Sequence, residues 1–127
     1  MANSELKPDA FVLSCPSRAL FARLGEKWSA LIVVKLSAEP LRFGALRRAV
    51  QGISQKMLTQ NLRLLERDGL VLRRLLSDRP IQVEYSLSKR GLALAPILSA
   101  LKVWAETHMH ATHTVQAQYD AQHGSQN

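Results

Sequence analysis

The sequence lacks the features that mark secreted or membrane proteins. Its single cysteine, Cys15, cannot form a disulfide within the chain, which excludes a disulfide framework and agrees with a reducing compartment. No apolar run approaches the roughly 18 to 20 uncharged residues that a membrane-spanning helix needs, and residues 1–10 have no signal-peptide pattern. We therefore predict a cytoplasmic protein that has no membrane partner.

Residue patterns that build catalytic or cofactor sites are also scarce. The six glycines are scattered and form no phosphate-binding loop, and no nucleophile, base and orienting group stand out together. The four histidines all follow residue 107 and lack the spacing and the cysteine or carboxylate neighbours of a zinc site. We predict no metal, no cofactor and no enzymatic activity. A thiol-reactive enzyme that uses Cys15 stays open as a remote alternative.

Acidic residues are few in the middle of the chain, where the basic residues concentrate. The net charge is +7, and the isoelectric point is about 10.2. Residues 42–90 hold four acids and eleven bases, namely Arg42, Arg47, Arg48, Lys56, Arg63, Arg67, Arg73, Arg74, Arg79, Lys89 and Arg90. Outside this range six bases balance six acids, so the whole excess lies in the middle. Such a charge distribution indicates a polyanionic partner such as nucleic acid.

The length and composition indicate one globular domain. The chain has 127 residues, of which 46% are hydrophobic and 21% charged. After a polar leader at residues 1–14, which we expect to be mobile, helices are predicted at residues 16–24, from residue 27 to the stop at Pro40, and up to residue 50 after a short extended entry.

The next segment, "ISQKMLTQNLRLLERDGLV", predicts an amphipathic helix at residues 54–68. Ser54 suits its N-cap, and leucines 58, 62 and 65 fall within roughly 60° of one another on a helical wheel, which predicts a buried stripe. The opposite side carries long amide and cationic side chains, namely Gln55, Lys56, Thr59, Gln60, Arg63 and Arg67. Side chains of these types can read base edges and bind phosphates.

The rest of the chain predicts a hairpin and a long helix. "LVLRRLLS" and "IQVEYSLS", separated by "DRP", favour two strands at residues 70–88, with Val83, Tyr85 and Leu87 on a buried face. A helix is predicted at residues 89–113 with surplus apolar surface, and residues 114–127 are expected to be a mobile polar tail. The fold class is therefore mainly α with a small β-hairpin, in the arrangement of a winged helix-turn-helix domain.

Several sequence stretches, occurring in order, closely resemble the HxlR-type transcriptional regulators, which are winged-helix proteins related to the MarR group. They are "CPSRALFARLGEKWSALIVVKL", "LRFGALRRAVQGISQKMLTQNLRLLERDGLVLRR" and "VEYSLSKRG". The resemblance covers about residues 15–104. Gly44, Ala45 and Ser88 depart from the residues that the family often has, but none of them lies on the proposed reading side of the helix.

The resemblance implies a homodimeric repressor or activator. It places the family domain at residues 15–113, the recognition helix at 54–68, the wing at 70–88 and a C-terminal dimerisation helix at 89–113. We expect the N- and C-terminal helices to form the dimer interface, with Leu20, Leu98, Leu101 and Trp104 as candidate contacts. A two-fold dimer would set two recognition helices about one DNA turn apart, which matches a roughly palindromic operator of double-stranded DNA.

Each basic or amide residue has a DNA-binding interpretation and a simpler one. Gln55, Lys56, Thr59, Gln60 and Arg63 are candidate base readers, although they could form an ordinary solvated face. The candidate phosphate contacts are Arg42, Arg47, Arg48, Arg73 and Arg74, with Arg79 for a minor groove or phosphate at the hairpin tip. A winged-helix module that binds protein in place of DNA is the other alternative.

Cys15 is the candidate regulatory residue. It precedes a proline at a helix start, where the helix dipole and the positive charge of Arg18 would favour a thiolate. Several members of the resembled family use a cysteine at this position to sense oxidants, quinones or aldehydes. Since the chain has no second cysteine, Cys15 could pair only across subunits or with a small thiol, or be oxidised or alkylated. A packed structural thiol in a ligand-responsive regulator is the equally weighted alternative.

Overall fold

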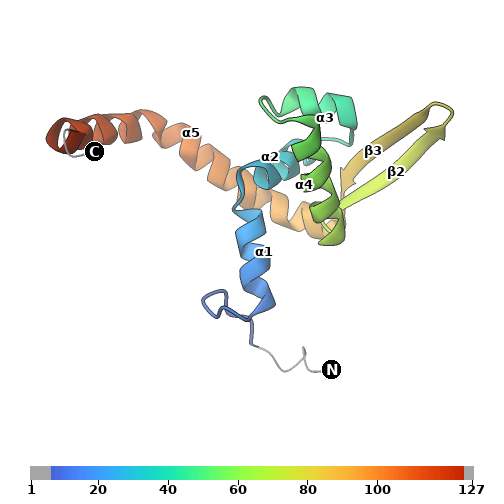
Figure 1. Cartoon of the computed structure of the whole chain (residues 1–127), viewed down its shortest axis with the longest axis horizontal. Helices are drawn as coiled ribbons and strands as arrows, with labels where there is room; N and C mark the ends of the chain where they lie inside the picture. Colours follow the sequence, from blue (N-terminus) through green and yellow to red (C-terminus); the bar gives the residue numbers. More distant parts are fainter. Residues whose placement is uncertain (1–6, 125–127) are drawn as a thin grey trace.

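Five helices and a three-stranded sheet make up residues 7–124, the part of the chain that the computed structural model describes (Figure 1). The helices and strands follow one another as α1 Pro16–Leu24, α2 Lys27–Leu36, β1 Leu41–Arg42, α3 Phe43–Ala49, α4 Gln55–Arg67, β2 Val71–Asp78, β3 Ile81–Leu87 and α5 Lys89–His123. The predicted fold class is confirmed. No helix within the described range is both long and apolar enough to cross a membrane.

The hydrophobic core lies among α2, α3, α4, the base of the hairpin and the first turns of α5. Leu58, Leu62 and Leu65 are almost completely buried, which confirms the leucine stripe expected on α4. Ile32 of α2 and Leu46 of α3 pack in the same cluster and are also inaccessible to solvent. Because one side of α4 is committed to this core, its opposite side must face outward.

The sheet has one strand more than the sequence predicted. The short extended entry to α3 is β1, which pairs antiparallel with β3 and places Leu41 opposite Tyr85, so the strand order is β1-β3-β2. The expected buried face of the hairpin holds at its base, where Leu87 is buried and Tyr85 packs against the core, whereas the distal part of the hairpin extends away from the helices (Figure 1). Only Leu87 of β3 is buried, and Val83 and Tyr85 are half-buried.

Helix α5 extends to His123, ten residues beyond the predicted end at residue 113. Residues 114–123, predicted to be a mobile tail, are helical because they include no glycine or proline and are rich in alanine and glutamine, which form helices readily. Residues 125–127 of that tail lie outside the described part of the chain. Beyond its first turns α5 projects away from the domain (Figure 1).

The four candidate interface residues divide into two kinds. Leu98 is only 7% exposed and packs in the core of the single chain, which leaves little of its side chain for a dimer contact. Leu101 and Trp104 are 60% and 58% exposed in the single chain, and Leu20 of α1 is half-buried. The helix thus carries large apolar side chains that nothing in this chain covers within the described residues.

The leader is partly ordered by turns. Residues 1–6 lie outside the described part, but in residues 9–15 the Val12 and Cys15 N–H groups donate to the Asp9 and Val12 carbonyls. These turns lead directly into α1, which has no fully buried residue.

Candidate nucleic-acid interface

Helix α4 starts and stops where the sequence predicted. The Ser54 hydroxyl accepts a hydrogen bond from the Met57 N–H at 3.1 Å and caps the N-terminus. Gly69, with φ of +76°, takes the left-handed conformation that releases the chain into β2. The first turn contains no acidic residue. The positive end of the helix dipole is therefore not neutralised by a neighbouring carboxylate and remains favourable for a phosphate.

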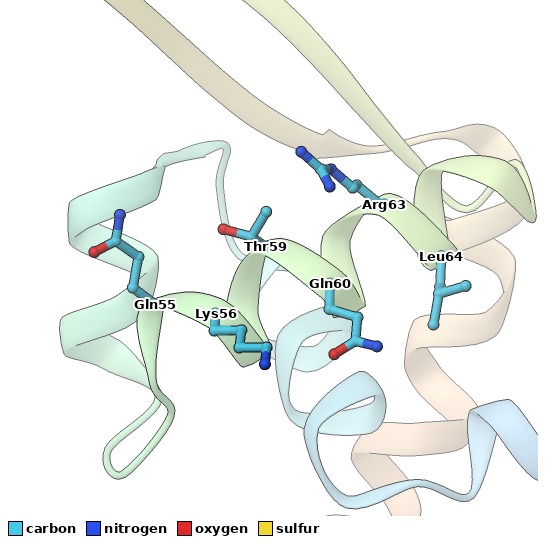
Figure 2. Close-up of a pocket in the computed structure, with 6 residues that line it drawn as sticks. All are labelled: Gln55, Lys56, Thr59, Gln60, Arg63 and Leu64. Carbon is cyan, nitrogen blue, oxygen red and sulfur yellow. The ribbon is translucent and has the colours of Figure 1, made fainter.

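The outward side of α4 forms a reading face, consisting of Gln55, Lys56, Thr59, Gln60, Arg63 and Leu64, which together line one hollow (Figure 2). Figure 2 shows that this face has two rows: Gln55, Thr59 and Arg63 point toward the wing, while Lys56, Gln60 and Leu64 lie along the other side. The structure thus brings together the five candidate base readers. Leu64 was not predicted, although its position one turn after Gln60 places it in the same row.

The wing continues the reading face on one side. Arg42, Gln55 and Thr59 share a hollow with Ile81, Gln82, Val83 and Tyr85 of β3. Next to it, Thr59 and Arg63 share a second hollow with Arg73 and Tyr85. Arg42 and Arg73 therefore lie beside the recognition helix, as a binding role requires. Tyr85 and Gln82 were missed because the sequence alternation assigned one to the core and the other to solvent, whereas both border the same hollow.

The remaining candidate phosphate contacts lie at the periphery. Arg47 and Arg48 are exposed in the last turn of α3. The guanidinium of Arg74 is 3.1 Å from the Glu84 carboxylate across the hairpin, so part of its charge is already balanced. Arg79 is exposed at the hairpin tip. None of these four lines the hollows beside α4, so any contact they make with DNA would be at the flanks.

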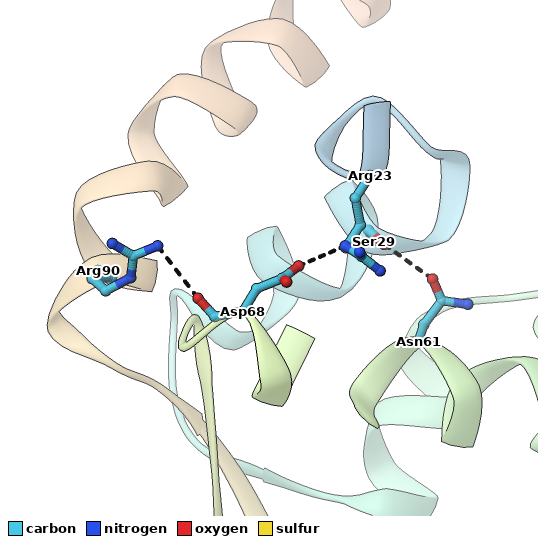
Figure 3. Close-up of polar contacts among 5 residues, drawn as sticks. All are labelled: Arg23, Ser29, Asn61, Asp68 and Arg90. Carbon is cyan, nitrogen blue, oxygen red and sulfur yellow. Dashed lines mark hydrogen bonds and ion pairs between the residues drawn. The ribbon is translucent and has the colours of Figure 1, made fainter. Parts of the chain in front are cut away.

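A buried polar pair orients α4 in the domain. The Ser29 hydroxyl of α2 donates to Asn61 Oδ1 at 3.0 Å (Figure 3). Asn61 Nδ2 in turn donates to the Met57 carbonyl at 2.8 Å. Both side chains are buried, and a buried polar group without a partner is costly. The pair therefore favours one rotation of α4 on α2. The sequence offered no signal for it, since Ser29 and Asn61 are 32 residues apart.

Cys15 is a free thiol at the N-cap of α1. Its Sγ accepts a hydrogen bond from the Asp9 N–H at 3.4 Å and lies 3.1 Å from the Ser17 hydroxyl. These contacts, the Asp9 N–H first and then the hydroxyl and N–H of Ser17, lower the thiol pKa against the opposing effects of partial burial and the Asp9 carboxylate. Arg18, which the sequence suggested as the stabilising charge, donates instead to the Phe11 carbonyl at 3.3 Å.

A metal centre has no support in the described part of the chain. Residues 7–124 include no group of three or more histidine, cysteine, aspartate or glutamate side chains arranged to hold an ion. His108 and His123 each stack on an aromatic ring one turn earlier, Trp104 and Tyr119 respectively.

Comparison with known proteins agrees with this geometry. The family model for the HxlR-like helix-turn-helix matches residues 23–113. The HTH-type transcriptional regulator YtfH of Escherichia coli strain K12 is 38% identical over 99 residues, which are 78% of this chain and 79% of that protein.

Two solved structures give the same result. The putative transcriptional regulator YtfH from Salmonella typhimurium has a TM-score of 0.83 and 34% identity, covering 87% of this chain and 99% of that one. The quinone-bound regulator YodB from Bacillus subtilis has a TM-score of 0.60 and 32% identity, covering 73% and 99%. The chain therefore belongs to the HxlR-like helix-turn-helix family and is a transcriptional regulator rather than an enzyme.

Proposed function

We propose that the protein regulates transcription as a homodimer that binds a specific double-stranded DNA operator through α4 and the wing. The observation that carries this proposal is the continuity of the reading face with the basic groups of the neighbouring elements. Gln55, Thr59 and Arg63 line the same hollows as Arg42 and Arg73. Chromosomal DNA as the target also implies a cytoplasmic location.

The chemistry of the surface suits a duplex. Gln55 and Gln60 carry amides that can pair with adenine in the major groove, and Lys56 and Arg63 can donate to guanine. The free N–H groups and the dipole at the start of α4 favour a phosphate there. The wing would then lie over the adjacent minor groove or backbone, with Arg79 at its tip.

The homodimer is supported by α5. Leu101, Trp104, Met109, Val115 and Tyr119 are all more than half exposed along one helix, and such surface is unfavourable in water. A second copy of the chain packed on this helix would cover it. By the symmetry of such a dimer, the two recognition helices would face two half-sites of a roughly palindromic operator.

Modification of Cys15 is the proposed control. The hydrogen bonds to Sγ lower its pKa, so a larger fraction is thiolate, which is the nucleophilic form. The structure of YodB with a bound quinone shows that a relative of this chain takes an electrophile. An electrophile that alkylates Sγ replaces the thiolate with a bulkier, uncharged and weaker acceptor for the Asp9 N–H, and so disturbs the start of α1.

A salt titration of DNA binding tests the proposal. Each protomer offers eight candidate phosphate or base contacts that are cationic, and if about four of them contact phosphate, the dimer should show a slope of log K against log salt of about −7. The measurement uses fluorescence anisotropy with a duplex enriched by the protein from a randomised library. The absence of duplex binding at low salt would refute the DNA-binding proposal and favour a protein-binding module.

A further inference from the structure

Three helices meet at Asp68, the residue that ends the recognition helix. Its carboxylate Oδ2 is 2.6 Å from Arg23 Nε in the last turn of α1, and its carbonyl accepts a hydrogen bond from Arg90 Nη2 of α5 at 3.3 Å (Figure 3). The Arg23 and Asp68 side chains are 19% and 16% exposed, so solvent screens the ion pair only weakly. The end of α4 is thus bonded to both helices that are expected to form the dimer.

The Asp68 side chain does not serve to cap its own helix. A carboxylate at a helix C-terminus lies at the negative end of the dipole, which is unfavourable. Its backbone N–H already donates to the Leu64 carbonyl at 2.9 Å, and Gly69 makes the turn. What the carboxylate adds is the ion pair with Arg23, and neither Oδ2 nor Nε has a hydrogen-bond partner in the described part of the chain.

Helix α1 has little else to hold it in place. It has no fully buried residue: Leu24 near its end packs against the core cluster, and half-buried Leu20 borders a hollow that Leu94 and Ile97 of α5 also line. A helix attached through so few apolar contacts depends strongly on a shielded ion pair for its orientation. By contrast, the Ser29–Asn61 pair joins α4 to α2, and both of these helices belong to the core of the same domain.

We propose that Arg23 and Asp68 are positioning residues that set the angle between each recognition helix and the dimer helices, and thereby the separation of the two reading faces. This inference rests on the proposed homodimeric DNA binding. Arg23 and Asp68 are outside the hollows that the reading face lines, and their side chains are mostly buried against each other, so the pair is not part of the reading face. It acts through geometry: an operator with two half-sites requires both recognition helices in register, whereas one half-site requires only one.

The test compares two duplexes with the full-length protein. One is the palindromic duplex that the wild-type protein enriches from a randomised library, and the other is a shorter duplex that carries a single half-site. Arg23→Gln and Asp68→Asn should each lower the affinity for the full operator by about five- to tenfold, which is in the lower part of the range of affinity changes seen between energetically coupled binding sites. The affinity for the half-site should change by less than about twofold.

Matched controls separate geometry from charge. Arg18→Gln removes one positive charge from the same helix, and Glu66→Gln removes one negative charge near the end of α4, so each should change both affinities by the same factor. Arg23→Lys keeps the charge but loses the planar guanidinium, and should give a smaller loss than Arg23→Gln. If a single variant does not fold, the exchanged pair Arg23→Asp with Asp68→Arg replaces it and should recover the wild-type ratio of the two affinities.

The outcomes are distinct. Equal losses on both duplexes mean that the pair merely supports α4, and no loss on either duplex means that the pair does not set the register. Either result overturns the inference while DNA binding stands. An exchanged pair that folds without recovering the ratio overturns it as well. If the wild-type protein enriches no duplex, the proposed function itself has failed.

Discussion

Replacing Gly91 with alanine should destabilise the protein, although alanine is ordinarily the better helix residue. Gly91 is buried in the first turn of α5, where a Cβ atom would lie 2.3 Å from the Leu70 carbonyl oxygen and 3.2 Å from both Cβ and Cδ2 of Leu87. The Leu70 carbonyl cannot move freely, because it accepts the Ser88 N–H at 3.0 Å where β2 leaves the core. The added methyl group must therefore push α5 away from the base of the wing.

The expected change in the free energy of unfolding of Gly91→Ala follows from two opposing effects. Glycine to alanine in a helix gains roughly 0.5 to 1 kcal/mol, whereas overpacking a core contact costs about 1 to 3 kcal/mol. A backbone oxygen at 2.3 Å places the cost in the upper part of that range. We expect a net loss of about 1 to 2 kcal/mol in the free energy of unfolding, which lowers Tm by roughly 3 to 10 °C in a chain of this size.

Thermal unfolding followed by circular dichroism measures this change, at one fixed protomer concentration because dimerisation shifts Tm by mass action. Gly44→Ala is the matched control, since its Cβ would meet only the far end of the Arg48 side chain at 3.3 Å. That variant should be as stable as wild type or slightly more stable. A Gly91→Ala protein that melts at or above the wild-type temperature would contradict the packing argument.

Other predictions concern binding, the thiol and assembly. Gln60→Ala should reduce the preference for operator over random DNA by about tenfold, and Arg48→Ala should weaken both alike with a shallower salt dependence; equal losses in both variants would refute this division of roles. Since hydrogen bonds lower the Cys15 pKa, its thiolate should form at lower pH than in the unfolded chain, so the midpoint of iodoacetamide alkylation against pH should rise when urea unfolds the protein. The same chain in urea is the control, and identical midpoints would remove the basis for a reactive thiol. An electrophile should lower operator affinity in wild type but not in Cys15→Ser, whereas identical responses would exclude control through this residue. Trp104→Ala should weaken self-association in sedimentation analysis, whereas Val83→Ala, in the wing, should not; an unchanged dimer would place the interface elsewhere.

The features that were predictable from sequence depend on neighbouring residues. Pro16 and Gly25 bound α1, Ser54 and Gly69 bound α4, and the leucine stripe of α4 identifies its buried side. Each is a local signal, because a cap or a stripe acts within a few residues of itself. The reading face followed directly, since the side of α4 that is not used for the core must be available for a partner.

The features that were missed depend on contacts between distant segments. Strand β1 has two residues and exists because the edge of β3, more than forty positions later, offers hydrogen-bond partners. The burial of Val83 is only partial for the converse reason: the alternation was present, but in the described part of the chain Val83 borders an open hollow beside α4 and is not packed in the core. A period of two indicates a strand with two different faces, and it does not reveal whether anything covers one of them.

Asp68 illustrates both the local signals and the distant contacts. Considered locally, it is an acid at the unfavourable end of a helix dipole. In the folded chain its carboxylate meets Arg23, 45 positions earlier, and its carbonyl meets Arg90. A residue that opposes a local preference has a reason to be there only if a distant partner compensates for it. Such residues are therefore informative places to look for the contacts that orient one element against another, and in this protein that reasoning leads from one aspartate to the geometry of both reading faces.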